Sequence, residues 1–171
     1  DEAEQLRSRC QGSEAIVTAV KEAEKKVKAP KLYDLTTLQR EANRIYGMTA
    51  KQTLDTAQSL YEKKLITYPR TDSQYLTDEM GESTEALIQM LTGKLPFAKE
   101  MKIQPDVKKV LNSKKVSDHH AIIPTMEVKK ADLESLKERN RKILYLISAR
   151  VLMATADSYI YESHKCQITC L

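Results

Sequence analysis

The sequence predicts a mainly α-helical protein of the α+β class, built on a core that resembles a helix-turn-helix unit. Three observations favour this class. Only 4 glycines and 5 prolines interrupt 171 residues, which suits long helices better than a turn-rich β architecture. Apolar residues recur at helical spacing between residues 36 and 61, after clear capping signals. Apolar and polar residues then alternate in 159–171, as they do in a strand.

The first two predicted helices carry start and stop signals. Thr36 or Thr37 is expected to cap the first helix, and Gly47 is expected to end it. A capping box at 49–52 is expected to start the second helix, which leads into a short extended segment at 65–70. This order of elements resembles a winged-helix arrangement. The expected apolar stripes of the two helices are Leu38, Ala42 and Ile45, and Leu54, Ala57, Leu60 and Tyr61.

The remaining elements are read from periodicity. Residues 14–28 are ambiguous, because the first half is β-branched and the second half has a helical composition. Helices are predicted at 85–91, which Gly93 stops, and at 106–111. The strongest helical pattern covers 133–155, with a break near Asn140 and a buried stripe of Ile143, Leu144, Ile147 and Val151.

Charge and cysteine content narrow the possible functions. Lysine and arginine outnumber the acids 28 to 24, and this mild excess permits nucleic-acid binding without requiring it. Three cysteines, an odd number, argue against a disulfide scaffold. Cys166, Cys170 and His164 make only a weak zinc pattern. Six lysines lie between residues 99 and 115, which is typical of a solvated face: Lys99, Lys102, Lys108, Lys109, Lys114 and Lys115.

No stretch approaches the ~20 apolar residues of a membrane span, and no signal peptide opens the sequence. We therefore expect a monomeric protein of the reducing cytoplasm that does not enter membranes. The sequence begins without methionine and stops within a strand pattern, so we expect it to be a piece of a longer polypeptide.

The segment 67–73 (TYPRTDS) is the most informative part of the sequence. Pro69 lacks an N–H group and favours extended geometry before it, and side chains two apart in an extended chain point the same way. Tyr68 and Arg70 are therefore expected to face one phosphate, the first as nucleophile and the second as a cationic clamp. The alternative is that Tyr68, one of eight tyrosines, simply packs in a wing.

A second cluster, 117–125 (SDHHAIIPT), holds two of the three histidines. Adjacent histidines in a loop usually cap or pack. Ligation of a metal by Asp118 with one or both rings is a second hypothesis. A third is that a histidine donates a hydrogen bond to a phosphate oxygen.

Together these segments resemble the type IA DNA topoisomerases, and within them the bacterial DNA topoisomerase III branch. The resemblance rests on LYDLTTLQREAN (32–43), LYEKKLITYPRTDSQYL (60–76) and DHHAIIPT (118–125), in this order and spacing. ITYPRTDS matches the active-site tyrosine signature of that family, and the 119–124 segment matches its downstream histidine motif. The combination is specific and covers residues 30–125.

The resemblance implies roles for individual residues. Tyr68 would attack a DNA phosphodiester and remain joined to the 5′ phosphate of the cleaved strand. Arg70 would hold the scissile phosphate, and His119 would be the histidine of the second motif, whereas His120 receives no chemical role. Residues that belong to the signature and are expected to contact DNA are Thr71, Asp72 and Ser73.

The resemblance also implies what lies outside this chain. The family binds Mg²⁺ through acidic residues of a toprim domain, and no such acidic cluster is visible here, so we expect no metal site in this chain. The chain would be a central segment: 1–29 and 157–171 would be short terminal β-strands of a neighbouring domain, and 30–156 the helical domain that carries the tyrosine. The expected partners are single-stranded DNA and the rest of the polypeptide, at the nucleoid.

Two other classes of protein remain as alternatives. In a non-catalytic winged-helix DNA-binding module, residues 36–63 would recognise DNA, but such a module has no use for the His119 motif. A tyrosine recombinase would place its tyrosine late in the chain, whereas Tyr68 precedes His119. In the DNA-binding alternative, the phosphate contacts would be Lys108, Lys109, Lys114 and Lys115.

Overall fold

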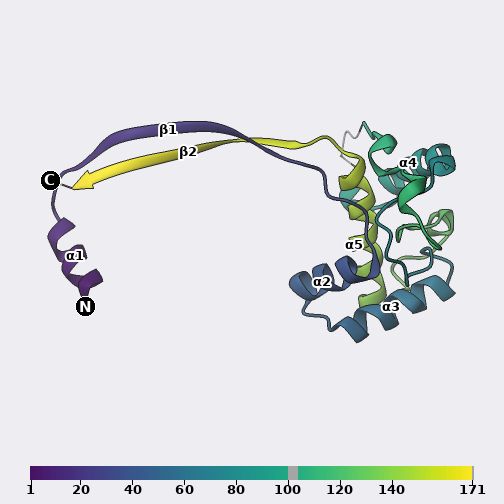
Figure 1. Ribbon diagram of the computed structural model, residues 1–171. Coiled ribbons are helices and arrows are strands. Elements are labelled where there is room, and N and C mark those ends of the chain that lie inside the picture. The colour runs from purple at the N-terminus through teal and green to yellow at the C-terminus, as the bar shows by residue number, and fades with distance from the viewer. Residues whose placement is uncertain (100–103, 171) are drawn as a thin grey trace. The chain divides into compact units, whose positions relative to one another are not determined.

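The computed structural model describes residues 1–99 and 104–170 (Figure 1). The chain divides into two compact units, one made of Asp1–Lys28 with the residues from Ser158 onward, the other of Ala29–Asp157. A two-stranded sheet dominates the first unit and helices dominate the second. The protein is therefore of the predicted α+β class.

The first unit contains α1 (Glu2–Cys10) and the antiparallel strands β1 (Ala15–Val27) and β2 (Tyr159–Cys170). The ambiguous segment 14–28 is thus a strand, as the family resemblance implied, and α1 was not anticipated. The predicted second strand ends within the described residues at Cys170, and Leu171 lies outside them. None of the described residues of this unit is buried, so the strand pair has no core of its own.

The second unit opens with α2 (Leu35–Tyr46) and α3 (Ala50–Glu62). The predicted Thr36 or Thr37 cap is wrong: Asp34 is the N-cap, and its carboxylate accepts hydrogen bonds from the backbone N–H and the hydroxyl of Thr37. Thr37 instead completes the capping box from the third helical position. Gly47 ends α2 with a left-handed φ of 64°, as expected for a glycine C-cap.

The second helix starts as predicted. Thr49 and Gln52 form the reciprocal hydrogen bonds of a capping box. The buried face of α3 differs in part from the predicted stripe, because Tyr61 is exposed while two threonines turn inward and bond the preceding helical turn. The buried residues of α3 are Thr53, Thr56, Ala57 and Leu60.

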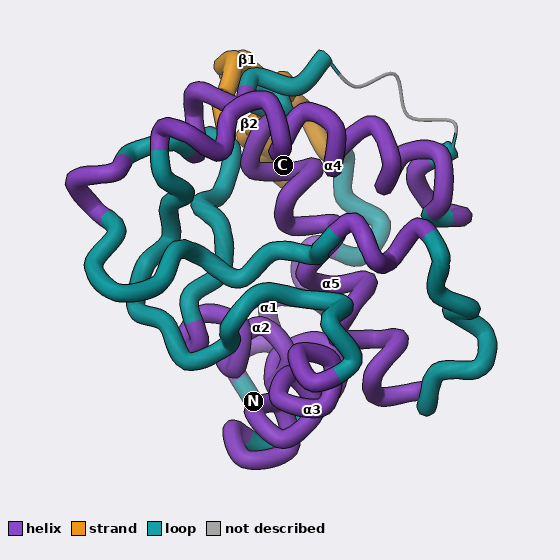
Figure 2. Tube along the Cα trace, turned by 90° about the vertical axis from the view of Figure 1, so that its right-hand side faces the viewer, coloured by secondary structure: helices purple, strands orange, loops and turns teal. Residues whose placement is uncertain are grey.

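Two further helices, α4 (Gly81–Lys94) and α5 (Glu138–Thr155), complete the unit. Figures 1 and 2 show α5 running between the α2–α3 pair and α4. The predicted buried stripe of α5 is confirmed, since Ile143, Leu144 and Ile147 are fully buried. No helix in the described part of the chain is long and apolar enough to cross a membrane.

The start of α5 was predicted too early, at residue 133. The Asp132 carboxylate accepts from the N–H of Glu134, and the hydroxyl of Ser135 donates to the Asp132 carbonyl. These local bonds favour a turn, and the helix begins only at Glu138. Asn140 does not break it: its side chain is buried and donates to Ser59 Oγ.

The predicted helix at 106–111 is a single 3-10 turn, η3 (Val107–Val110). The chain leaves the turn because Leu111 pairs with Leu76 in a parallel bridge, and the backbone N–H of Leu76 donates to the Val110 carbonyl. The other 3-10 turns are η1 (Asp78–Met80), η2 (Pro96–Ala98), η4 (Ser113–Lys115) and η5 (Met126–Lys129).

Candidate active site

The two motifs found in the sequence lie side by side because their backbones pair. Ile66 and Pro124 form an antiparallel bridge, and the N–H of Thr67 donates to the Ile123 carbonyl at 2.9 Å. The Thr67 hydroxyl adds two bonds, accepting from the N–H of Ile123 and donating to the carbonyl of Ala121. The residue just before the predicted nucleophile therefore fastens one motif to the other.

This pairing brings the rings of Tyr68 and His119 together. Their centroids are 4.4 Å apart, with planes inclined at 47°. Tyr68 is half-buried, whereas the imidazole of His119 is exposed. The phenol and the imidazole thus meet at the surface of the helical unit.

Tyr61, from the last turn of α3, is a site residue that the sequence reasoning missed. Its ring meets the Tyr68 ring edge-on, with centroids 5.4 Å apart and planes at 75°. Because it is 39% exposed, it does not belong to the buried stripe predicted for it, and its ring contact with Tyr68 places it beside the candidate site. The sequence signal available was an aromatic residue at the end of a helix, one short turn before the TYPRTDS segment.

A hollow of about 240 Å³ lies next to this ring cluster. Arg70 and His119 both line it, so His119 is shared between the hollow and the Tyr68 ring. Arg70 is exposed, and no carboxylate of the described residues forms an ion pair with its guanidinium. A planar guanidinium in this position suits an anion with two oxygens to offer. The other lining residues are Thr71, Asp72, Ser117 and Asp118.

The small hydroxyl residues of the tyrosine motif hold the histidine loop. The Thr71 hydroxyl donates to the His119 carbonyl at 2.8 Å, and the Ser73 hydroxyl donates to the Lys115 carbonyl at 2.9 Å. Both side chains are buried, with exposures of 8% and 4%. Asp72, in contrast, is exposed and accepts from the hydroxyl of Ser117.

The other histidine of the second motif is turned to a local partner. Nδ1 of His120 lies 2.8 Å from the carbonyl oxygen of the next residue, Ala121. Within residues 1–99 and 104–170, no three His, Cys, Asp or Glu side chains gather closely enough to hold a metal ion. The side chains that meet at the candidate site include a phenol, a guanidinium and an imidazole.

The four lysines predicted to contact DNA phosphates lie in different environments. Lys108 and Lys114 are exposed. The ammonium group of Lys109 already has partners within the chain, because it donates hydrogen bonds to the Ala156 carbonyl and the Asp157 carboxylate. Lys115 lies over the Tyr75 ring. Lys102, from the same lysine-rich stretch, lies outside the described residues.

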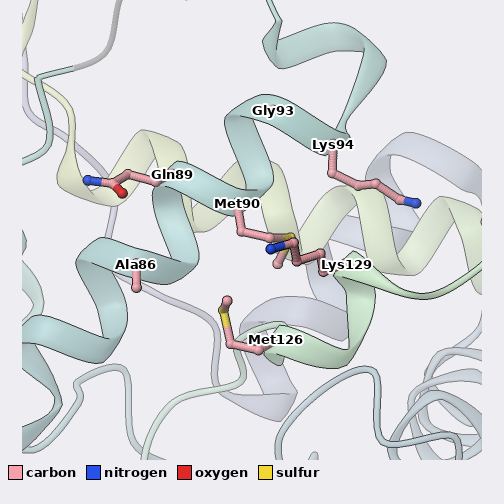
Figure 3. Close-up of a pocket in the computed structure, with 7 residues that line it drawn as sticks. All are labelled: Ala86, Gln89, Met90, Gly93, Lys94, Met126 and Lys129. Atoms are coloured by element: carbon pink, nitrogen blue, oxygen red, sulfur yellow. The ribbon is translucent and has the colours of Figure 1, made fainter.

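A larger hollow of about 490 Å³ lies elsewhere, between α4 and η5 (Figure 3). Its walls carry the methionines Met90 and Met126 and the lysines Lys94 and Lys129. None of the predicted site residues lines it, and its lining contains neither a tyrosine nor a histidine. Size alone therefore does not mark the candidate site.

Comparison with known proteins identifies the family to which this chain belongs. A sequence profile of the family described as DNA topoisomerase matches residues 1–171, and the chain belongs to this family. It is 40% identical to DNA topoisomerase 3 of Bacillus subtilis over an alignment 174 residues long, which covers 96% of the chain. It is 41% identical to DNA topoisomerase 3 of Bacillus licheniformis over 167 residues, which cover 94% of the chain.

A solved structure, that of full-length topoisomerase I from Thermotoga maritima, also matches. The TM-score is 0.65 and the identity 28%, over 96% of this chain and 27% of that one. The chain spans only 23% of the length of the two Bacillus relatives. The resemblance to a bacterial topoisomerase III-like segment of the type IA class is thereby confirmed.

Proposed function

We propose that the longer protein containing this chain cleaves and rejoins one strand of DNA through Tyr68, and so relaxes or decatenates DNA. The observation that carries the proposal is the contact between the Tyr68 and His119 rings at 4.4 Å, beside the hollow that Arg70 lines. Family membership supports it, because relatives at about 40% identity are named DNA topoisomerase 3.

In this reaction the Tyr68 phenolic oxygen attacks the phosphorus of a DNA phosphodiester. A Tyr–O–P bond forms, the bond to the 3′ oxygen breaks, and the 3′ oxygen leaves with a proton as a hydroxyl. The phenol, whose usual pKa is near 10, must give up its own proton in the process. The reverse attack by the 3′ hydroxyl restores the strand, and no external energy is needed because a phosphodiester is exchanged for a phosphodiester.

Arg70 and His119 would act on the phosphate in this scheme. The planar guanidinium binds two phosphoryl oxygens, and the imidazole N–H donates to an oxygen as negative charge builds on it. Removing one such donor typically slows a reaction by about 10²–10³-fold. Thr71 and Ser73 would contribute by holding the His119 loop, whereas Asp72 is exposed at the hollow and remains a candidate contact to the DNA.

We assign Mg²⁺ to another part of the longer protein, because the described residues offer no group of metal ligands. Bound there, it would neutralise phosphate charge, and this chain by itself would be nearly inert. We further infer that residues 1–29 and 157–171 belong to a neighbouring strand domain and that 30–156 carry the tyrosine. The division into two compact units near these boundaries supports this inference.

We also propose that α2, α3 and the extended segment 65–70 act as a winged-helix-like platform for single-stranded DNA. The capped turn between Gly47 and Thr49, which joins the two helices, supports this. Because the relatives are bacterial proteins, the place of action would be the cytoplasm, at the nucleoid. We further infer that the protein acts as a monomer. A platform without catalysis would leave the contact between Tyr68 and His119 without a role.

Replacing Tyr68 with phenylalanine in the full-length protein tests the nucleophile. The variant should form no covalent protein–DNA adduct, because it lacks the attacking oxygen, while its affinity for single-stranded DNA stays close to that of the wild type. The measurement is a denaturing gel with an oligonucleotide that carries its label internally and none at either end. A binding titration of the same variant is run in parallel. Adduct formed by Tyr68→Phe would end the assignment.

A further inference from the structure

Two lysines converge on one aromatic ring next to the candidate site. The ammonium nitrogen of Lys31 lies 5.5 Å from the centre of the Tyr75 ring, and that of Lys115 lies 4.8 Å from it. Both lysines are exposed and the ring is half-buried. Each contact has the geometry of a cation–π interaction, which holds an ammonium group in a defined place.

The charges of these two lysines are not balanced within the described residues. No carboxylate there lies within ion-pairing distance of either ammonium group. The comparable contact of Lys142 with the Tyr46 ring differs, because the Lys142 ammonium is paired with Glu138 at 2.6 Å. Two cations held at one ring without a counter-charge repel each other, and an anion placed between them relieves the repulsion.

Tyr75 and Lys115 come from the same two chain segments that build the hollow at Arg70, and Lys31 joins them from the segment before α2. The Ser73 hydroxyl donates to the Lys115 carbonyl, and the Ser73 Oγ accepts from the N–H of Tyr75. Tyr75 follows Arg70 by five residues, a span of at most roughly 18 Å. A strand with one phosphate at Arg70 therefore needs only a short stretch to bring another phosphate to Tyr75.

We propose that Lys31, Tyr75 and Lys115 form a second phosphate site, which holds the backbone of the DNA strand next to its point of cleavage. The two ammonium groups bind one phosphate jointly, and the Tyr75 ring keeps them in position. The identification of the ligand as DNA rests on the proposed function, whereas the site for a backbone phosphate rests on the geometry of the cluster.

The test is a titration of the full-length protein with a fluorescein-labelled oligothymidylate at several potassium chloride concentrations. The double variant Lys31→Gln/Lys115→Gln should bind about tenfold more weakly at low salt. The slope of log K against log salt should become shallower by roughly 0.7, the share of one phosphate of a single strand. The effects of the two single substitutions should not add, because the two lysines share one anion.

The role of the Tyr75 ring in positioning the two ammonium groups is tested separately. Tyr75→Leu should weaken binding by about two- to fivefold, because the ammonium groups lose the surface that positions them, while Tyr75→Phe keeps the ring and should bind as the wild type does. Lys142→Gln is the matched control: it removes a lysine from a ring of the same geometry, but one whose charge is already paired. Its affinity and salt slope should not change.

An unchanged affinity and salt slope in the double variant would overturn the phosphate site, and so would an equal loss in Lys142→Gln. Thermal melting of each variant establishes that a loss of binding is not a loss of fold. The covalent adduct formed by the wild type with the same oligonucleotide is measured alongside. Absence of that adduct would refute the proposed function but not the phosphate site, so the two failures are distinguishable.

Discussion

At the scale of single residues, the site combines Tyr68 and Arg70, which are two residues apart, with His119 from a segment about 50 residues further along the chain. His119 is the link, because its ring contacts Tyr68 and also lines the hollow with Arg70. The exposed guanidinium and imidazole are accessible to a phosphate, while the half-buried phenol contacts two neighbouring rings, those of Tyr61 and His119. Accessibility and fixed orientation are two of the properties that a protein nucleophile needs.

Replacing Arg70 with lysine should slow DNA cleavage without loss of the fold. An ammonium group keeps the charge but offers a point contact in place of the planar fork. We expect single-turnover adduct formation by the full-length protein to slow by up to about 10²-fold, and Arg70→Ala to slow it more. Equal rates for Arg70→Lys and the wild type would show that the fork geometry is irrelevant.

Tyr61 should act as a positioning residue for the nucleophile. An edge-to-face aromatic pair contributes about 0.5–1.5 kcal/mol, so Tyr61→Leu should slow adduct formation by about two- to tenfold. Tyr61→Phe keeps the ring and serves as the control. Single-turnover kinetics with saturating oligonucleotide separate this effect from binding, and a wild-type rate in Tyr61→Leu would refute the positioning role.

At the scale of elements, the turn between α2 and α3 depends on glycine at position 47. Its φ of 64° lies in the left-handed region, and a Cβ there would meet no atom within 4 Å, so only backbone strain opposes a substitution. Gly47→Ala should therefore lower the free energy of unfolding by about 1–2 kcal/mol, as measured by urea denaturation.

Gly93 gives a matched control for this prediction. It lies inside α4, its φ is not positive, and a Cβ there would also meet nothing within 4 Å. Gly93→Ala should raise the free energy of unfolding by about 0.5–1 kcal/mol, because alanine favours the helix. Changes of the same sign in both variants would contradict the conformational argument.

The elements that the sequence could predict are those governed by local interactions. The Gly47 C-cap, the capping box at Thr49 and the buried face of α5 all follow from neighbours in the chain. The predicted helix at 106–111 failed because Leu111 pairs with Leu76, a contact between distant residues. The contact between Tyr68 and His119 is equally non-local: it depends on the pairing of Ile66 with Pro124, and only the family resemblance pointed to it in advance.

At the scale of the whole molecule, the two units differ in what stabilises them. The helical unit has a continuous apolar core, whereas none of the described residues in the strand unit is buried. A lone pair of strands is marginally stable in water. The stability of this chain is therefore concentrated in residues 29–157.

Hydrogen exchange on the isolated chain should show this difference directly. Amides of β1 and β2 should exchange many times faster than those of Ile143–Leu152 in α5, because the strand pair opens without exposing a core. Mass spectrometry of peptides after timed exchange measures both regions in one experiment. Equal protection of the two regions would mean that the strands are stabilised by something other than their own pairing.

The hydroxyl bonds of Thr71 and Ser73 to the carbonyls of His119 and Lys115 have a consequence for protein engineering. These bonds join the segment 66–76 to the loop 113–125, so we expect that the two can be exchanged between relatives only together. A chimera that takes the tyrosine segment from one relative and the histidine loop from another should misalign its imidazole even though every reacting group is present. Grafting both segments together should preserve the alignment.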